Sequence, residues 1–325
     1  MTAARRTETM LDACGHLAVW PGLYAGGCVL FIESLTGGPF RWRPVAIAGF
    51  LTTGTYLLDR LGPWPSMPDR ADLASTPERV RFLRRRVPHS RVLASAVLLA
   101  SFALSLAEGV FAAALVPLAV LGMIGYAHPP GAWRLKDRLL LKNAVVAASM
   151  TAMAVVLVAF PGWPRFGATV QWAPLALAAA ALFMHVMAGA MLCDLDDADS
   201  DARHGTRTLP NTIGAEKTWW CAEALTAAAG ALTLLGVACG LVSPGLGVAI
   251  AGLPLAAVIL LRAAGPMRTR DLVDVLYPIA VAAALLLAGW PAATGSSSTD
   301  AVFRALEESA DVGPVPPEHE PRDSE

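Results

Sequence analysis

Long apolar runs separated by shorter polar connections make up most of this 325-residue chain. About nine of the runs approach the ~20 residues that a helix needs to cross the hydrocarbon core of a bilayer. We place them at 14–34, 44–60, 90–107, 109–127, 142–160, 170–193, 216–240, 243–262 and 272–292. They are apolar on nearly all sides, as expected in lipid, where a helix satisfies its own backbone groups. The pattern predicts an all-α, multi-pass membrane protein of about nine packed transmembrane helices.

Composition supports the same class of protein. Hydrophobic residues make up 55% of the chain and charged residues 16%, with a mean hydropathy of +0.52. The net charge of −1 gives no electrostatic argument for a nucleic-acid partner. Five scattered cysteines form no CxxC pair, so neither a zinc site nor a disulfide framework is indicated.

Two segments differ from the apolar runs. Residues 293–325 carry eight acidic residues against two arginines and several prolines, which predicts a disordered tail after a membrane domain at 1–292. Between the second and third runs, Ser75-Thr76-Pro77-Glu78 resembles a capping box that begins a basic helix of about ten residues. We expect this helix to end near Pro88 and to lie at the membrane interface.

The distribution of arginine and lysine predicts the orientation of the chain. The connection 60–91 carries eight arginines, and connections 4–5, 6–7 and 8–9 are also basic, whereas the alternate connections carry little charge. Arg41 and Arg43 in the first connection are the exception. The positive-inside rule then places the N-terminus and the charged connections in the cytoplasm and the C-terminus outside.

The strongest chemical signal follows the sixth run, where five aspartates fall between Asp194 and Asp201. If the helix continues through them, Asp194, Asp197 and Asp201 share one face and Asp196 and Asp199 point elsewhere. Carboxylates crowded in this way repel unless a cation lies between them, and Mg²⁺ is typically held by few carboxylates together with substrate phosphates. Arg203 and Arg207, just beyond, are suitable donors for phosphate oxygens.

The pattern D-x-x-D-x-x-x-D-x-x-x-G-x-x-T-L-P runs unbroken from Asp194 to Pro210. It resembles the second aspartate-rich motif of the UbiA superfamily of intramembrane prenyltransferases, whose helices surround a central cavity. The first motif of that family, N-D-x-x-D-x-x-x-D, is degenerate here. At the matching place, the end of the second run, only Asp59 is present, followed by Arg60, while Thr55, Tyr56 and Pro63 stand at the other positions.

The resemblance implies a Mg²⁺-dependent enzyme that ionises an isoprenyl diphosphate within the lipid bilayer. Asp59, Asp194, Asp197 and Asp201 would be the metal-binding and catalytic residues. The substrate-binding residues would be Arg60, Tyr126, Lys136, Lys142, Asn143, Arg203 and Arg207. The prenyl group would pass to an aromatic or other nucleophilic acceptor. Two alternatives stay open: a terpene cyclase, in which the cation is captured within the same molecule, and a non-catalytic membrane protein or transporter.

His185 lies within the sixth run, two and a half helical turns before Asp194. An ionisable residue inside a membrane span is a candidate functional residue. The alternative is a neutral histidine bonded to a neighbouring helix.

Overall fold

The computed structural model describes residues 3–61, 76–126, 138–161, 170–265 and 269–289, with side chains described from residue 10 onward. Every regular element in these ranges is a helix. Nine of the helices are long: α2 (Val19–Leu35), α3 (Trp42–Leu61), α6 (Val87–Glu108), α7 (Val110–Tyr126), α8 (Leu141–Ala159), α9 (Trp172–Cys193), α12 (Ala215–Ala238), α13 (Pro244–Ala264) and α14 (Thr269–Leu287). Each coincides with one of the nine predicted runs, which confirms the all-α membrane fold.

Length and composition support fewer than nine membrane crossings among the described helices. Five of the described helices are long and apolar enough to span a bilayer, or six if the bent pair α1 and α2 is counted as one span. Helix α7, with 17 residues, is shorter, and α3 and α14 are not among the five. The count of nine spans therefore stays a prediction.

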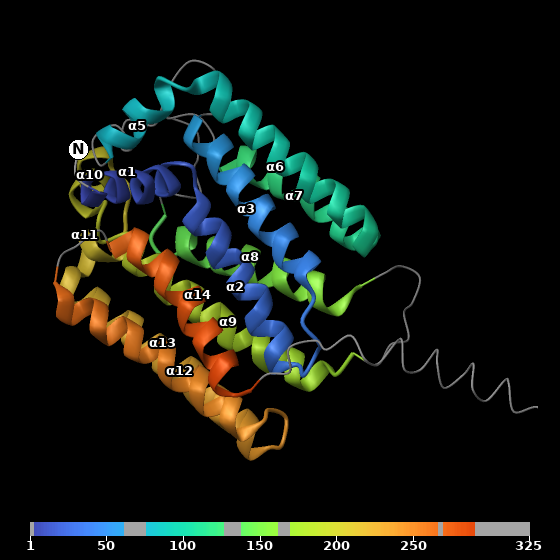
Figure 1. The fold of residues 1–325 in the computed structure, drawn as a ribbon. Helices are drawn as coiled ribbons and strands as arrows, with labels where there is room; N and C mark the ends of the chain where they lie inside the picture. The colour runs from blue at the N-terminus through green and yellow to red at the C-terminus, as the bar shows by residue number, and fades with distance from the viewer. Residues whose placement is uncertain (1–2, 62–75, 127–137, 162–169, 266–268, 290–325) are drawn as a thin grey trace, which may run out of the picture. The chain divides into compact units, whose positions relative to one another are not determined.

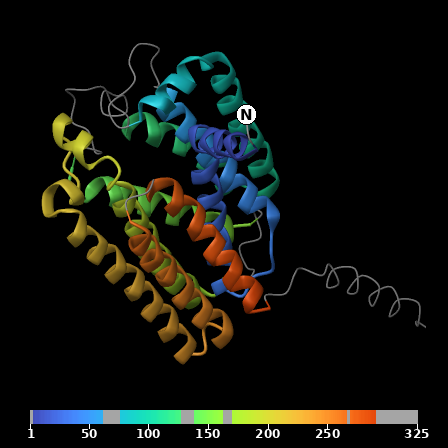
Figure 2. The same cartoon turned by 60° about the vertical axis from the view of Figure 1, so that its left-hand side comes forward.

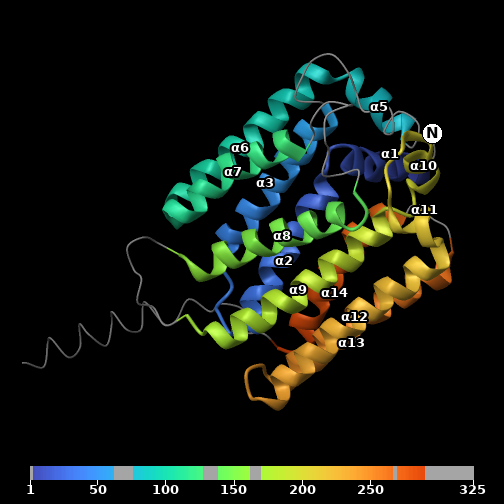
Figure 3. The same ribbon diagram turned by 180° about the vertical axis from the view of Figure 1, so that it is seen from behind.

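Four shorter helices complete the described chain: α1 (Ala3–His16), α5 (Pro77–Arg84), α10 (Ala198–His204) and α11 (Leu209–Ile213). Figures 1 and 3 show all four at the same end of the long helices. Helix α5 is the predicted basic helix, but its N-cap is Thr76, and Pro88 lies in the first turn of α6 rather than at the end of α5. The first predicted run is also interrupted, because the chain bends by 71° between α1 and α2 at Ala18, whose φ is +59°.

Helix α2 is central to the packing. It contacts α3, α8, α9 and α14, while α12 and α13 pair with each other and flank α9 and α14 (Figures 1 and 2). Small residues allow the close contacts: a Cβ on Gly27 would lie 3.0 Å from Cβ of Pro278 in α14. The contacts place α9, which carries the aspartate motif at its end, between α8 and α12, with α2 and α14 also packed against it.

Arg41 lies in a buried charge cluster far from the aspartate motif. Its Nε donates to Glu33 at 2.9 Å, and Glu33 is only 1% exposed. Its Nη2 donates to the carbonyl oxygens of Leu157 and Val158 at 3.2 and 3.3 Å, which lie in the last turn of α8. Arg41 therefore satisfies a buried carboxylate and the end of a helix. This structural role explains why the first connection carries a basic residue on the side where the other connections carry little charge.

We expect Arg41→Ala to destabilise the protein strongly, by about 3 kcal/mol or more, because it leaves the Glu33 carboxylate buried without a counter-charge. Arg43→Ala is the matched control: the Arg43 side chain is 50% exposed and lies 3.8 Å from Glu108, so its loss should cost about 1 kcal/mol or less. Thermal unfolding of the purified proteins in detergent compares the two. Equal losses would contradict the assigned role of Arg41.

Candidate active site

The aspartate motif begins where α9 ends. The helix stops at Cys193, residues 194–197 form a turn, and α10 starts at Ala198. Aspartate favours caps and turns over helix interiors because its side chain competes for backbone hydrogen bonds. The expectation that Asp194, Asp197 and Asp201 follow one continuous helical face is therefore wrong. Asp194 and Asp201 lie near Lys142 of α8, whereas Asp197 pairs with Arg270 of α14.

Asp194 is held by α8. Lys142 Nζ donates to Asp194 Oδ1 at 2.7 Å, and Asn143 Nδ2 donates to Asp194 Oδ2 at 3.1 Å. Asp194 is 2% exposed and Asn143 is 3% exposed. Both carboxylate oxygens thus have strong donors in the first turn of α8, and the contact fixes α8 against the end of α9.

Asp196 and Asp197 both contact the start of α14. Asp196 accepts from the backbone N–H groups of Thr269 and Arg270 at 3.2 and 2.8 Å, which caps the helix and places a negative charge at its N-terminus. Asp197 forms an ion pair with the Arg270 guanidinium. Arg270 Nη2 also donates to the Cys193 carbonyl oxygen at 3.4 Å. The turn after α9 therefore joins α8 on one side to α14 on the other.

Asp201 lies in α10 and is 6% exposed. Its Oδ2 is buried without a hydrogen-bond partner, although Lys142 Nζ lies 3.8 Å away. Burial raises the pKa of Asp201 to about 6; the Lys142 charge opposes this shift, and the charges of Asp197 and Asp194 add to it. Burial also acts on Asp197, but the charge and hydrogen bond of Arg270 outweigh it and hold the Asp197 pKa below its ordinary value.

The end of the motif, from Gly205 to Pro210, shapes the backbone. Gly205 ends α10 with a φ of +80°, a left-handed conformation that glycine adopts without strain. Asn211 then closes the next turn, because its Oδ1 accepts from the Thr208 N–H at 2.9 Å and its Nδ2 donates to the Thr206 carbonyl at 2.8 Å. Pro210 lies in the first turn of α11, where its missing N–H has no consequence. These residues turn the chain back toward α12.

The other residues named from the sequence are spread around this turn. Asp59 is half-buried in the last turn of α3, and Arg60 donates to the carbonyl oxygens of Gly15 and His16 at 2.6 and 3.1 Å. Tyr126 is half-buried at the end of α7. Arg203 and Arg207 are exposed, and Arg203 donates to its own helix at the Asp199 carbonyl. Lys136 lies outside the described residues.

Sequence reasoning missed two arginines. Arg270 contacts Asp197 directly, and Arg79 of α5 is only 8% exposed and acts electrostatically on both Arg60 and Asp197. Both stand in strongly basic connections. The charge pattern indicates only orientation for Arg270, and for the basic helix that carries Arg79 it predicts a place at the membrane interface, with its arginines facing lipid headgroups or a diphosphate. The position of Arg270 at the start of the ninth run, on the same predicted side as the aspartates, was the available signal.

The residues present suit a divalent cation only together with a ligand that brings further oxygens. Among the described residues, no three Asp, Glu, His or Cys side chains are placed to hold a metal ion. Asp194 has both oxygens in hydrogen bonds, whereas Asp197 Oδ1 and Asp201 Oδ2 are buried and accept no hydrogen bond. Mg²⁺ is commonly bound by one or two carboxylates plus substrate phosphates, and these two oxygens fit that requirement.

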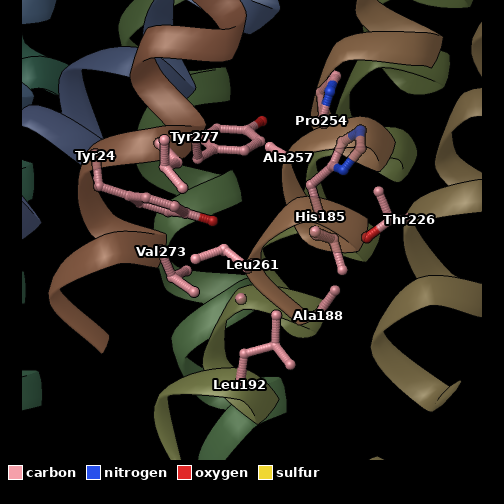
Figure 4. Close-up of a pocket in the computed structure, with 13 residues that line it drawn as sticks. Tyr24, His185, Ala188, Leu192, Thr226, Pro254, Ala257, Leu261, Val273 and Tyr277 are labelled. Atoms are coloured by element: carbon pink, nitrogen blue, oxygen red, sulfur yellow. The ribbon is translucent and has the colours of Figure 1, made fainter. Parts of the chain in front are cut away.

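A separate cavity lies deeper along α9 (Figure 4). Its volume is about 30 Å³. Tyr24 and Tyr277 enter it from one side and His185 and Thr226 from the other. The cavity lies among α2, α9, α12, α13 and α14, and the rest of its lining is small or aliphatic.

Comparison with known proteins gives one family. The model of the UbiA prenyltransferase family matches residues 70–275 of this chain. A UbiA homolog from Archaeoglobus fulgidus bound to DMAPP and Mg²⁺ is similar in structure, with a TM-score of 0.56, 15% identity and coverage of 86% of this chain and 96% of that one. The apo structure of a UbiA homolog from Aeropyrum pernix K1 gives a TM-score of 0.52 at 20% identity, with coverage of 82% of this chain and 98% of that one.

A structure from work on the biosynthesis of digeranylgeranylglyceryl phosphate synthase in membranes gives a TM-score of 0.52 at 14% identity, covering 86% of this chain and 99% of that one. At these identities, the structural likeness shows the fold alone. No curated protein matches the sequence significantly.

Proposed function

The chain belongs to the UbiA prenyltransferase family, and from this premise we propose that it is a Mg²⁺-dependent intramembrane prenyltransferase. It ionises an isoprenyl diphosphate and transfers the prenyl group to an aromatic or other nucleophilic acceptor. The observation that carries the proposal is the pair of buried carboxylate oxygens on Asp197 and Asp201 in the segment after α9. Lys142 of α8 lies 3.8 Å from Asp201, and Arg270 of α14 forms an ion pair with Asp197.

The protein is an integral membrane protein, since it combines several long apolar helices with membership of this family. We propose that its site opens to the cytoplasm, as the arginine and lysine distribution predicts. The helices then shield an allylic cation from water on the membrane side. The likeness to a UbiA homolog bound to DMAPP and Mg²⁺ supports an isoprenyl diphosphate as the substrate.

In this mechanism, Asp197 and Asp201 would hold the cation, and Asp59 of α3 would approach from the other half of the site. When bound, Mg²⁺ supplies positive charge that stabilises the leaving diphosphate. Lys142 and Arg270 donate to carboxylates in the structure, and we propose that they turn toward the diphosphate oxygens when substrate is present. Their positive charges stabilise the negative charge that develops on the leaving diphosphate as the allylic C–O bond breaks.

The diphosphate site is proposed to extend to Lys136, Arg203 and Arg207. Tyr126 and Arg60 would lie at its edge. Arg203 and Arg207 are both exposed, so a ligand can reach them from solvent. Asn143 has a different proposed role: because it donates to Asp194, it orients that carboxylate and thereby the turn that carries Asp197.

The proposal is tested by diphosphate release from the full-length protein in detergent. Geranyl, farnesyl and geranylgeranyl diphosphates are supplied with Mg²⁺, first alone and then with a panel of phenols and naphthols, and the organic products are identified. Release with a prenylated phenol supports the transferase. A cyclic hydrocarbon or alcohol formed without acceptor would replace it by a terpene cyclase. The absence of release under every condition would contradict both and favour a non-catalytic protein.

The pKa of Asp201, about 6, predicts a pH dependence of divalent-cation binding. Above pH 6 the carboxylate is ionised and can bind a cation; below pH 6 a proton competes, and affinity falls by about tenfold per pH unit. Asp197, with its lowered pKa, stays ionised in this range. Binding of Mn²⁺ in the presence of inorganic pyrophosphate, followed by electron paramagnetic resonance at pH 5.0 and 7.5, measures the effect.

Asp201→Asn is the control for this pH dependence. It should bind Mn²⁺ more weakly at pH 7.5 and show a smaller difference between the two pH values than the unmodified protein; the difference that remains is the protonation of pyrophosphate itself. An equal pH difference in the unmodified protein and in Asp201→Asn would contradict the assignment of Asp201 as a cation ligand.

A further inference from the structure

We propose that the junction of α5 and α6 is a binding site for the headgroup of an anionic phospholipid. Its polar part consists of Arg84, Arg85 and Arg91, which are all exposed and which we call the arginine patch. Its apolar part is the lipid-facing side of α6, which begins beside Arg91. The site goes beyond the proposed prenyl transfer, because a lipid bound here neither supplies nor accepts a prenyl group.

The junction concentrates positive charge without acidic neighbours. From Arg79 to Arg91 the chain has six arginines and no aspartate or glutamate. Within the described ranges, no carboxylate forms an ion pair with any residue of the arginine patch. Guanidinium groups bind phosphate oxygens through two parallel hydrogen bonds, so the patch is suited to a phosphate ligand.

The structure divides the arginines of this segment into two sets. Arg79 is 8% exposed and acts electrostatically on Asp197, so it belongs to the candidate active site. Arg81 donates to a backbone carbonyl of its own helix, and Arg86 lies over the Phe82 ring. The arginine patch is on the outer side of the segment and is therefore available to a ligand other than the substrate diphosphate.

Buried contacts hold the segment against the long helices. Val80 and Leu83 of α5 are 8% and 4% exposed, and Leu83 packs in one cluster with Leu57 of α3 and Ala94 of α6. One side of α5 is thus fixed to the bundle, while the arginine patch lies where the bundle leaves the chain open. A ligand meets a backbone that is already in place and orders only the arginine side chains.

The exposed side of α6 places the arginine patch at the level of lipid headgroups. Val92, Leu99 and Leu106 are 69%, 68% and 61% exposed and recur every seven residues, so they share one face of the helix. Helix α6 is long and apolar enough to span a bilayer, and this face therefore contacts acyl chains. From Arg91 to Leu106 it extends about 22 Å along the helix, most of the hydrocarbon thickness of a bilayer.

The end of this apolar face is where the phosphates of a bilayer lie. Arg91 directly precedes Val92, and Figure 1 shows α5 joining α6 at the same end of the long helices. A phospholipid whose acyl chains lie along α6 thus brings its phosphate to the arginine patch. This continuity of an apolar face with a basic one identifies a membrane lipid, rather than a soluble anion, as the occupant.

The charge of the arginine patch selects an anionic lipid over a zwitterionic one. A phosphatidylcholine headgroup carries a quaternary ammonium beside its phosphate, and the segment from Arg79 to Arg91 has no acidic side chain to receive that cation. A headgroup with a net negative charge has no such mismatch. On the orientation that the arginine and lysine distribution predicts, this end faces the cytoplasm, whose leaflet carries the anionic lipids.

The test is native mass spectrometry of the full-length protein in detergent, without Mg²⁺ or an isoprenyl diphosphate. Phosphatidylglycerol and phosphatidylcholine with identical acyl chains are added in turn, and each variant is mixed with the unmodified protein so that both compete for the lipid. We expect phosphatidylglycerol to bind more tightly than phosphatidylcholine. The triple variant Arg84→Gln/Arg85→Gln/Arg91→Gln should weaken phosphatidylglycerol binding about tenfold or more, since each basic residue near an anionic headgroup contributes about fivefold.

Two further variants are the controls. Arg43→Gln removes an exposed arginine at the other end of α6, beside Glu108, and should reduce phosphatidylglycerol binding less than Arg91→Gln does. The triple lysine variant Arg84→Lys/Arg85→Lys/Arg91→Lys keeps the charge and should bind this lipid more tightly than the triple glutamine variant. Thermal unfolding without lipid should be the same in the unmodified protein and both triple variants, because the substituted residues are exposed. Added phosphatidylglycerol should then protect the unmodified protein more than the triple glutamine variant.

Equal affinities for the two lipids would overturn the proposal, as would unchanged phosphatidylglycerol binding by the triple glutamine variant. Displacement of the lipid by inorganic pyrophosphate, beyond the effect of sodium chloride at the same ionic strength, would also overturn it by identifying a site for soluble anions. If diphosphate release fails while phosphatidylglycerol still binds at the arginine patch, the proposed function is lost and this site remains.

Discussion

Asp201→Asn is expected to reduce Mg²⁺-dependent diphosphate release on the order of a hundredfold or more. The substitution keeps the size of the side chain and removes the negative charge that a cation requires, so the leaving diphosphate loses its main electrostatic stabilisation. Asp201 is the suitable target because it is buried and its Oδ2 accepts no hydrogen bond. The assay is diphosphate release from geranylgeranyl diphosphate with saturating Mg²⁺.

Asp199→Asn is the control, since it changes another aspartate of the same short helix. Asp199 is exposed, so we expect release within about twofold of the unmodified protein, as for most exposed substitutions. Comparable losses in the two variants would indicate that the acidity of the segment as a whole, rather than a defined cation site, supports the reaction. Full activity in Asp201→Asn would contradict the proposed mechanism.

Asp59→Asn extends the comparison to the degenerate first motif. Asp59 is the one aspartate of that motif present in the chain, and it is half-buried at the end of α3. A loss as large as that of Asp201→Asn would place Asp59 in the cation site. Unchanged release would show that the reaction depends only on the second motif.

Much of the fold could be predicted from the chain because lipid-spanning helices need long apolar runs. Each of the nine long helices coincides with such a run, since neither helix length nor apolarity depends on distant partners. The bend between α1 and α2 could not be predicted in this way. The apolar run continues through Ala18, and the break there depends on a left-handed backbone that the residue type does not favour.

The sequence predicts which aspartates belong to the candidate site, but only partly how their side chains are placed. The spacing of Asp194, Asp197 and Asp201 would have aligned them on an uninterrupted helix, but the chain turns after Cys193. Asp196 instead caps α14 and Asp197 pairs with Arg270. Those partners are more than seventy residues away in sequence, and helical periodicity carries no information over that distance.

The count of arginines and lysines, which predicts the orientation of the chain, does not fit Arg41 for a related reason. A count of arginines treats every side chain as free to face water or lipid headgroups. Arg41 is committed to Glu33 and to the end of α8, so it contributes to packing rather than to orientation. Arg79 and Arg270 show the same limitation in the connections that do follow the rule.

Lys142→Met is expected to destabilise the protein by about 3–5 kcal/mol, because it leaves the Asp194 carboxylate buried with one strong donor and no counter-charge. Asp194 is 2% exposed and lies 2.7 Å from Lys142 Nζ. Lys217→Met is the control: Lys217 is exposed at the start of α12, and its loss should change stability by less than about 0.5 kcal/mol. Unfolding in detergent measures both.

The double variant Lys142→Met/Asp194→Leu separates the two roles of Lys142. Replacing both partners of a buried ion pair by apolar residues is often neutral or stabilising, so most of the lost stability should return. Diphosphate release should not return, because the charge near Asp201 and the orientation of the turn are both lost. Recovery of release together with stability would show that Lys142 serves only to hold α8 against α9, and that the clamp on the diphosphate is built without it.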